Sequence, residues 1–210
     1  MNISNILASS PVVAILRHIP LADTVTYAQA ALNAGVRAFE VALNSENALD
    51  QISILRTSLP DEIFVGAGTC ITVEKCRQAH DSGAQFFLSP AANDKVLEYC
   101  AESELALLPG VMTPSDVEKC VNHGFNHLKL FPASDLPKNY IRSLKGPFDG
   151  TEYVAVGGVS PSNMKDFFDR GFIGVGIGSN LFSKELVQQR KWDKACSELR
   201  GYTKILEGIK

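Results

Sequence analysis

The residue of this chain whose position best suits a catalytic role is a lysine in the middle of an apolar segment. In His127–Phe131, alternation puts Lys129 on one face of a strand and its two leucine neighbours on the other. If the leucines meet a helix layer, Lys129 points inward, where burial lowers the pKa of an amine. A neutral amine can attack a ketone and form an imine at neutral pH. A lysine that reaches the rim, or that only pairs with an acid, is the alternative.

A carboxylate occupies the same kind of position in an earlier segment. In Ala38–Leu43, Glu40 shares one face with two alanines, whereas the larger apolar side chains lie on the other. We therefore expect Glu40 to face the interior together with Lys129. There it could move protons while the imine forms and hydrolyses and while a carbon–carbon bond breaks. A purely structural ion pair with Lys129 is the alternative.

Glycines follow two later apolar segments, where a strand gives way to a loop. Gly157 and Gly158 end one of these segments, and Gly178 with Ser179 ends the next. Glycine allows a phosphate to approach backbone N–H groups closely, although a tight turn would explain either motif alone. At neighbouring positions of a sheet, the two motifs together indicate a phosphate site.

Two further residues could contact a ligand. Thr69 follows Gly66–Gly68, where glycines leave room for a ligand and the hydroxyl can bind a carboxylate, although turn geometry would also explain the motif. Phe131 could form an apolar wall beside the reacting carbons, or belong to the core. The four histidines show no metal-ligand spacing, so we expect no metal site.

Apolar, β-rich segments alternate with helix-like segments from end to end, as in a parallel sheet with helical crossovers. The eight segments predicted as strands are Val12–Arg17, Ala38–Leu43, Phe64–Thr69, Phe86–Pro90, Leu105–Gly110, His127–Pro132, Tyr153–Val159 and Gly174–Ser179. The segments predicted as helices are Asp23–Asn33, Ala48–Ser58, Val73–Asp81, Asp94–Glu102, Pro114–Asn122, Asn139–Lys145, Ser162–Arg170 and a region from about Trp192 onward. Helix ends are expected at Gly35, Gly83, Gly124 and Gly171. Helix starts are expected at Thr113-Pro114 and Ser160-Pro161.

This alternation fits a barrel or a doubly wound open sheet. Polar residues follow many of the strands, and only in a barrel do all carboxyl ends of the strands surround one mouth. We therefore predict an α/β fold, a single (β/α)8 TIM barrel that forms one catalytic domain over residues 1–210.

Composition narrows the partners and the compartment. The chain has 210 residues, 45% of them hydrophobic, and a net charge of −3, which leaves no general basic field for nucleic acid or an anionic membrane. The five cysteines lack C-x-x-C spacing, which argues against disulfides and a zinc cage. The N-terminal segment lacks the basic start of an export signal. We expect a cytoplasmic protein with a small-molecule ligand.

Taken in order, these motifs resemble the class I 2-keto-3-deoxy-6-phosphogluconate and 2-keto-3-deoxy-6-phosphogalactonate aldolase family (the KDPG/KHG aldolases). The motifs that carry the resemblance are Ala14–Arg17, Glu40–Leu43, Gly66–Thr69, Ser89-Pro90, Pro109-Gly110, Lys129–Ala133, Gly157-Gly158 and Gly178-Ser179. The resemblance implies a TIM barrel, a homotrimer and no cofactor or metal. It implies that Lys129 forms a Schiff base and that Glu40 moves protons.

The resemblance also implies how a substrate is held. Pyruvyl contacts would come from Thr69, Pro90 and Phe131. Phosphate contacts would come from Gly157, Gly158, Gly178 and Ser179. Arg17 matches an arginine near the family site.

One departure bears on the substrate. Gluconate-type members commonly read Leu-Arg-Thr after the second strand, with an arginine that helps hold the carboxylate, whereas this chain reads Leu43-Asn44-Ser45. That form, like Val156–Val159, resembles the galactonate branch, so we expect 2-keto-3-deoxy-6-phosphogalactonate as substrate, cleaved to pyruvate and glyceraldehyde 3-phosphate. Arg17 could take over the missing charge. The alternatives are a 2-keto-3-deoxy-6-phosphogluconate or 4-hydroxy-2-oxoglutarate aldolase, a metal-dependent phosphosugar epimerase, and a non-catalytic phosphometabolite-binding barrel.

Overall fold

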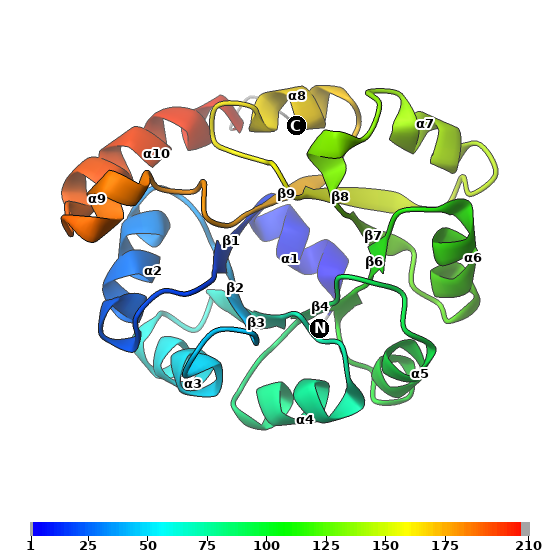
Figure 1. Cartoon of the computed structure of the whole chain (residues 1–210), viewed down its shortest axis with the longest axis horizontal. Coiled ribbons are helices and arrows are strands. Elements are labelled where there is room, and N and C mark those ends of the chain that lie inside the picture. The colour runs from blue at the N-terminus through cyan, green and yellow to red at the C-terminus, as the bar shows by residue number, and fades with distance from the viewer. Residues whose placement is uncertain (1, 207–210) are drawn as a thin grey trace.

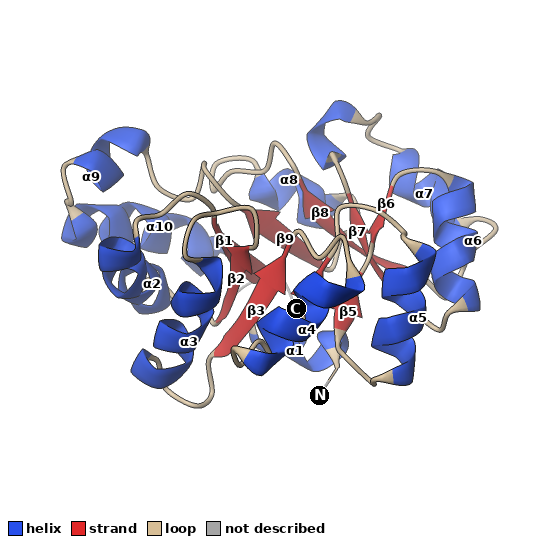
Figure 2. Cartoon of the chain, turned by 60° about the horizontal axis from the view of Figure 1, so that its bottom comes forward, coloured by secondary structure: helices blue, strands red, loops and turns tan. Residues whose placement is uncertain are grey.

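A ring of parallel strands surrounded by helices makes up the computed structural model, which describes residues 2–206 (Figures 1 and 2). The strand order is β5-β4-β3-β2-β1-β9-β8-β7-β6. The strands are β1 (Val12–Leu16), β2 (Ala38–Ala42), β3 (Phe64–Gly68), β4 (Phe87–Leu88), β5 (Leu107–Leu108), β6 (Gly110–Val111), β7 (His127–Leu130), β8 (Glu152–Val156) and β9 (Gly174–Ile177). Because β1 pairs with both β2 and β9, the first and last strands close the ring. The predicted TIM barrel is confirmed.

The helices pack around this ring, and all but the first lie outside it (Figure 1). They are α1 (Ile3–Ser9), α2 (Thr24–Asn33), α3 (Ala48–Ser58), α4 (Val73–Asp81), α5 (Asp94–Glu102), α6 (Pro114–Asn122), α7 (Tyr140–Lys145), α8 (Met164–Asp169), α9 (Lys184–Gln188) and α10 (Trp192–Leu206), with 3-10 turns η1 (Leu21–Asp23) and η2 (Ala133–Asp135). The four glycines expected at helix ends all have positive φ, between 85° and 104°. None of the helices within residues 2–206 has the length and apolarity that a bilayer crossing requires.

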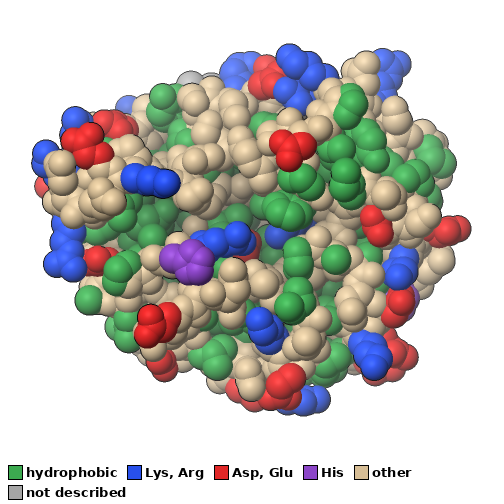
Figure 3. All heavy atoms as spheres, viewed as in Figure 1, with side chains coloured by type: hydrophobic (Ala, Val, Ile, Leu, Met, Phe, Trp, Pro, Cys, Tyr) green, Lys and Arg blue, Asp and Glu red, His purple; other side chains and the backbone are tan. Residues whose placement is uncertain are grey.

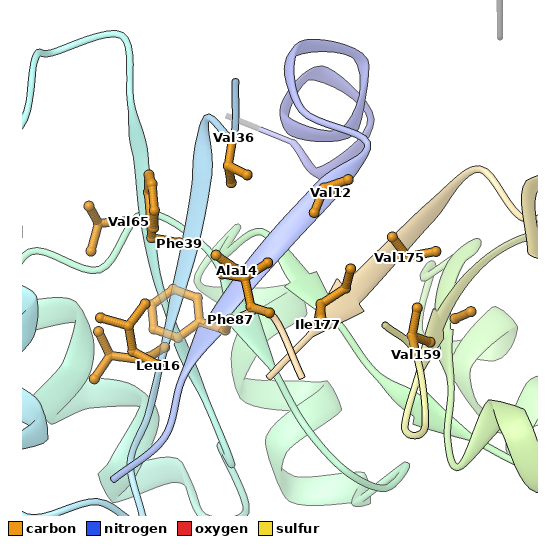
Figure 4. Packing of buried hydrophobic residues seen from close by; sticks show 14 of the residues in the cluster. Val12, Ala14, Leu16, Val36, Phe39, Val65, Phe87, Val159, Val175 and Ile177 are labelled. Carbon is orange, nitrogen blue, oxygen red and sulfur yellow. The ribbon is translucent and has the colours of Figure 1, made fainter. Parts of the chain in front are cut away.

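Alternation along the strands sorts side chains into two cores. Outward-facing residues such as Ala14, Leu16 and Phe39 pack under the helices (Figure 4). Inward-facing residues fill the barrel interior, and those of β1 are Val13 and Ile15. The two cores follow directly from the two-residue period of a strand.

Helix α1 closes the amino-terminal end of the barrel, as its central place in Figure 1 shows. Ile3, Ile6 and Leu7 belong to the same buried cluster as the inward side chains of the strands. This helix is not among those predicted from the sequence. The three side chains have the i, i+3, i+4 spacing of one apolar helix face, which was the signal for it.

Two other predictions need correction. The predicted strand Leu105–Gly110 is split into β5 and β6 by Pro109, so that nine strands replace the expected eight. The predicted helix start at Ser160-Pro161 is wrong, because α8 begins at Met164 and the amide of Asn163 instead accepts a hydrogen bond from the Ser160 backbone N–H at 2.8 Å. The start at Thr113-Pro114 is confirmed by a complete capping box.

Candidate active site

Lys129 projects from the centre of β7 into the barrel. Its side chain is buried, at 4% exposure, while Leu128 and Leu130 pack under the helices. Burial lowers the pKa of the amine, and the positive charge of Arg17 lowers it further. Glu40 and Cys70 raise the pKa, but the net shift is downward. The Phe131 ring centroid lies 5.3 Å from Nζ and offers the amine an apolar neighbour. The surroundings are those that favour the nucleophilic, neutral form.

Glu40 faces the same interior from β2 and is completely buried, at 1% exposure. Burial raises the pKa of its carboxyl group, and the positive charges of Lys129 and Arg17 partly offset that rise. Within residues 2–206, its Oε2 atom has no hydrogen-bond partner. A buried carboxylate oxygen without a protein partner is costly unless water or another group bonds to it.

The glycines before Thr69 make room for protein atoms, which corrects the expectation that they leave room for a ligand. A Cβ atom on Gly68 would lie 1.5 Å from Oε1 of Glu40, and one on Gly66 would lie 2.6 Å from the Phe86 ring. Gly68 therefore allows the Glu40 carboxylate to lie directly on the backbone of β3. This contact between neighbouring strands has no sequence signal beyond the glycine itself.

Thr69, Pro90 and Phe131 stand at the carboxyl ends of β3, β4 and β7, which surround the mouth of the barrel. Thr69 has a φ of 62°, which is rare for a β-branched residue and marks a held conformation. Phe131 is 37% exposed. Pro90 packs against Gly110, where a Cβ atom would lie 2.3 Å from the proline carbonyl carbon.

Arg17 continues the inward-facing series of β1 beyond Val13 and Ile15. Its guanidinium lies close enough to lower the pKa of both Glu40 and Lys129. Figure 3, which has the view of Figure 1, shows Lys or Arg, His and acidic side chains gathered in a hollow near the centre of this face. The mouth thus combines positive charge with a buried acid.

The two glycine motifs lie side by side because β8 and β9 are paired up to Val156 and Gly176. Gly157 and Gly158 have φ values of 94° and 71°, which favour glycine. A Cβ atom on Gly158 would also lie 1.9 Å from Oγ of Ser134.

Gly178 differs from the glycines after β8. A Cβ atom there would meet only ordinary contacts, 3.7 Å from Ile15, and its φ is not left-handed. Turn geometry therefore explains the motif after β8, whereas no contact with the residues that the structure describes requires glycine at position 178. Ser179, the next residue, is exposed beside it.

Similarity to known proteins identifies the family. The family model for KDPG and KHG aldolase matches residues 3–197. The chain belongs to the KDPG and KHG aldolase family.

This aldolase is similar to named relatives over nearly its whole length. It is 30% identical over 208 residues to the KHG/KDPG aldolase of Escherichia coli, which covers 98% of this chain and 95% of the relative. It is 29% identical over 198 residues to the 2-dehydro-3-deoxy-6-phosphogalactonate aldolase of Escherichia coli, with 94% and 97% covered.

A solved structure extends the similarity to the whole architecture of the aldolase. The KDPG aldolase of Legionella pneumophila, captured with pyruvate as a covalent carbinolamine intermediate, matches with a TM-score of 0.84 at 28% identity, covering 93% of this chain and 94% of that one. The chain is therefore a class I aldolase, a carbon–carbon lyase.

Proposed function

We propose that this aldolase cleaves 2-keto-3-deoxy-6-phosphogalactonate to pyruvate and glyceraldehyde 3-phosphate through a Schiff base on Lys129. The observation that carries the proposal is that Lys129 and Glu40 are buried in the same barrel interior, below its mouth. Among the described residues, one oxygen of the Glu40 carboxylate has no hydrogen-bond partner. Residues 1–210 act as one catalytic domain.

The chemistry begins with attack of the neutral Lys129 amine on C2 of the substrate, followed by loss of water to give a protonated imine. This imine accepts the electron pair of the C3–C4 bond while the C4 hydroxyl loses its proton, and glyceraldehyde 3-phosphate leaves. The resulting enamine is protonated at C3, and hydrolysis releases pyruvate and the free amine. Glu40 takes up and returns these protons through water, because burial raises the pKa of its carboxyl group and makes the protonated form more accessible.

The remaining contacts hold the two ends of the substrate. Arg17 and Thr69 bind the carboxylate, and Pro90 and Phe131 border the pyruvyl carbons. The phosphate lies on the backbone of the loops after β8 and β9, formed by Gly157, Gly158, Gly178 and Ser179. Gly178 supports this placement, since no contact among residues 2–206 accounts for a glycine there.

The galactonate substrate is supported by Leu43-Asn44-Ser45 and by Val156 before the glycines. The two candidate substrates differ in configuration at C4, so discrimination rests on a few polar contacts. We expect the larger kcat/KM with the galactonate epimer. An equal or larger value with the gluconate epimer, or with 4-hydroxy-2-oxoglutarate, would overturn this assignment and leave the aldolase mechanism intact.

Borohydride reduction in the presence of pyruvate, followed by peptide mapping, tests the mechanism. We expect a covalent adduct at Lys129 and none in Lys129→Met. Absence of an adduct, together with no turnover of either epimer, would favour a non-catalytic phosphometabolite-binding barrel.

We further propose a cytoplasmic homotrimer that works without metal or organic cofactor. Light scattering of the purified protein should give three times the chain mass of 22.8 kDa. Dialysis against a chelator should leave kcat unchanged; a loss that added metal restores would argue for the metal-dependent epimerase instead.

A further inference from the structure

The loop after β2 is joined by its side chains to both neighbouring loops at the mouth. Ser45 Oγ accepts a hydrogen bond from the His18 backbone N–H at 2.9 Å, and Asn44 Oδ1 accepts one from Thr69 Oγ1 at 3.4 Å. The Ser45 backbone N–H donates to the carbonyl of Ala42 at 2.9 Å, which ties the loop to its own strand. Two adjacent residues thus bridge the ends of β1, β2 and β3.

Both residues reached by these bonds have unfavourable backbone conformations. His18 has a φ of 56° and Thr69 a φ of 62°, in the left-handed region that favours glycine. Such conformations persist where surrounding contacts hold them, and they cluster at functional sites. Ser45 and Asn44 supply those contacts, one at each residue.

The two held residues directly follow residues of the site. His18 follows Arg17, so its conformation sets the direction in which the chain leaves the barrel interior at the guanidinium. Thr69 follows Gly68, against which the Glu40 carboxylate packs. A change at either residue therefore acts on the groups around the reacting carbons.

We propose that Asn44 and Ser45 are positioning residues for the aldolase reaction. Ser45 holds Arg17 over the Lys129 amine and the Glu40 carboxylate through the backbone of His18, and Asn44 holds the Thr69 hydroxyl. Neither side chain needs to touch the substrate. The inference rests on the proposed roles of Lys129, Arg17 and Thr69.

Substitution of Ser45 tests the first contact. In Ser45→Ala, we expect KM for the keto acid to rise about tenfold, the effect of one hydrogen bond, with kcat changed less than about twofold. Ser45→Thr keeps a hydroxyl and should restore the parent KM. Ser53→Ala is the matched control, because Ser53 is an exposed serine on the following helix that bonds only to backbone carbonyls. It should keep the parent KM.

A double-mutant cycle tests the route through His18. Glycine adopts a φ near 56° without support, so Ser45→Ala should raise KM less in the His18→Gly background than in the parent. Equal penalties in both backgrounds would overturn this route. Should Ser45→Ala not fold alone, Ser45→Cys, whose sulfur accepts a hydrogen bond only weakly, replaces it in both backgrounds.

The pH profile supplies a readout that a general structural defect would not change. The charges that act on Glu40 are those of Lys129 and Arg17, and those that act on Lys129 come from Glu40, Arg17 and Cys70. Arg17 lowers the pKa of both groups, so moving it away should shift both limbs of the kcat/KM profile to higher pH. The shift in Ser45→Ala should disappear in the Arg17→Met background.

The second contact is tested at Asn44. Asn44→Ala should raise KM in the parent and add nothing in the Thr69→Ala background. Parent KM values and pH profiles in both Ser45→Ala and Asn44→Ala would overturn the inference. Borohydride trapping separates the two proposals: an adduct at Lys129 in parent and variants preserves the aldolase mechanism even if positioning fails, whereas no adduct in the parent would remove the mechanism itself.

Discussion

The two ends of the barrel interior are built by the same strands, yet they differ in every chemical respect. At the amino-terminal end, Val13 and Ala38 meet the apolar face of α1, which closes the barrel. Two positions after Ala38, β2 presents Glu40, and Arg17 follows directly after the end of β1. The same inward-facing row therefore belongs to the apolar core near α1 and to the candidate active site near the mouth.

This difference shows that position along an inward row decides what a side chain does. Near α1, an inward side chain is surrounded by apolar atoms and contributes through burial. Near the mouth, the inward side chains of Lys129 and Glu40 are charged groups that burial desolvates, so burial changes the pKa of each. Substitutions at the two ends should therefore separate activity from stability.

Lys129→Met should show the largest effect, a fall in kcat of about 10⁴-fold or more, because it removes the proposed nucleophile. The fold should survive, since an apolar side chain replaces a buried amine. Steady-state turnover measures the loss. Lys119→Met, at an exposed lysine paired with Asp94 at 3.1 Å, is the control and should keep the parent kcat.

Gly68→Ala should come next, with kcat lowered by about 10²- to 10⁴-fold, the usual contribution of a proton-transfer group. The added methyl group would occupy the position of Oε1 and displace the Glu40 carboxylate. Gly150→Ala, where a Cβ atom meets nothing within 4 Å, should leave kcat unchanged. A Gly68→Ala protein with full activity would show that this carboxylate position is not required.

Ile6→Ala in α1 should reverse the pattern. Truncating this 1% exposed side chain should lower the free energy of unfolding by about 2–5 kcal/mol, while KM for the keto acid stays near the parent value. Urea titration measures the loss. Ile54→Ala, at a 37% exposed isoleucine of α3, should cost about 0.5 kcal/mol or less. A large KM change in Ile6→Ala would contradict the separation of the two ends.

The smallest expected effect is on the pH dependence of stability. Glu40 has a pKa above its ordinary 4.5. Between pH 4.5 and that raised pKa, the folded state binds more protons than the unfolded state, so stability falls as pH rises through this interval. Lys129 has a pKa below its ordinary 10.5, so stability rises again as pH approaches 10.5.

The double variant Glu40→Gln with Lys129→Met removes both groups and should flatten that dependence. Its gain in free energy of unfolding over the parent should be about 1–4 kcal/mol near neutral pH and should shrink toward both ends of the interval. Denaturant titrations across the range measure it. A gain independent of pH would show that neither group is titrated abnormally.

Sequence patterns predicted what depends on period and burial. The two-residue alternation placed Lys129 and Glu40 inside, and glycine and proline positions marked most helix ends. The same patterns could not locate the break at Pro109, because a proline at the end of an apolar run is compatible with a continuous strand until its neighbours are known.

The contacts around the mouth were beyond the sequence for a different reason. The two-residue alternation of a strand does not predict the left-handed conformation of Thr69. Nor does it predict the hydrogen bond from the His18 backbone N–H to Ser45, because the two residues lie in different loops. Gly68 could be identified as a close-packing position, but its partner, Glu40, lies on another strand. Tertiary contacts of single loops therefore set the details of the mouth that the sequence does not reveal.

The pairing of β1 with β9 has a consequence for biosynthesis. One edge of β1 pairs with β2, but the other edge finds its partners at Val175, Gly176 and Ile177, so almost the whole chain must leave the ribosome before the ring can close. Until then β1 presents an open edge that can pair with other chains, which makes nascent forms of this protein candidates for chaperone capture.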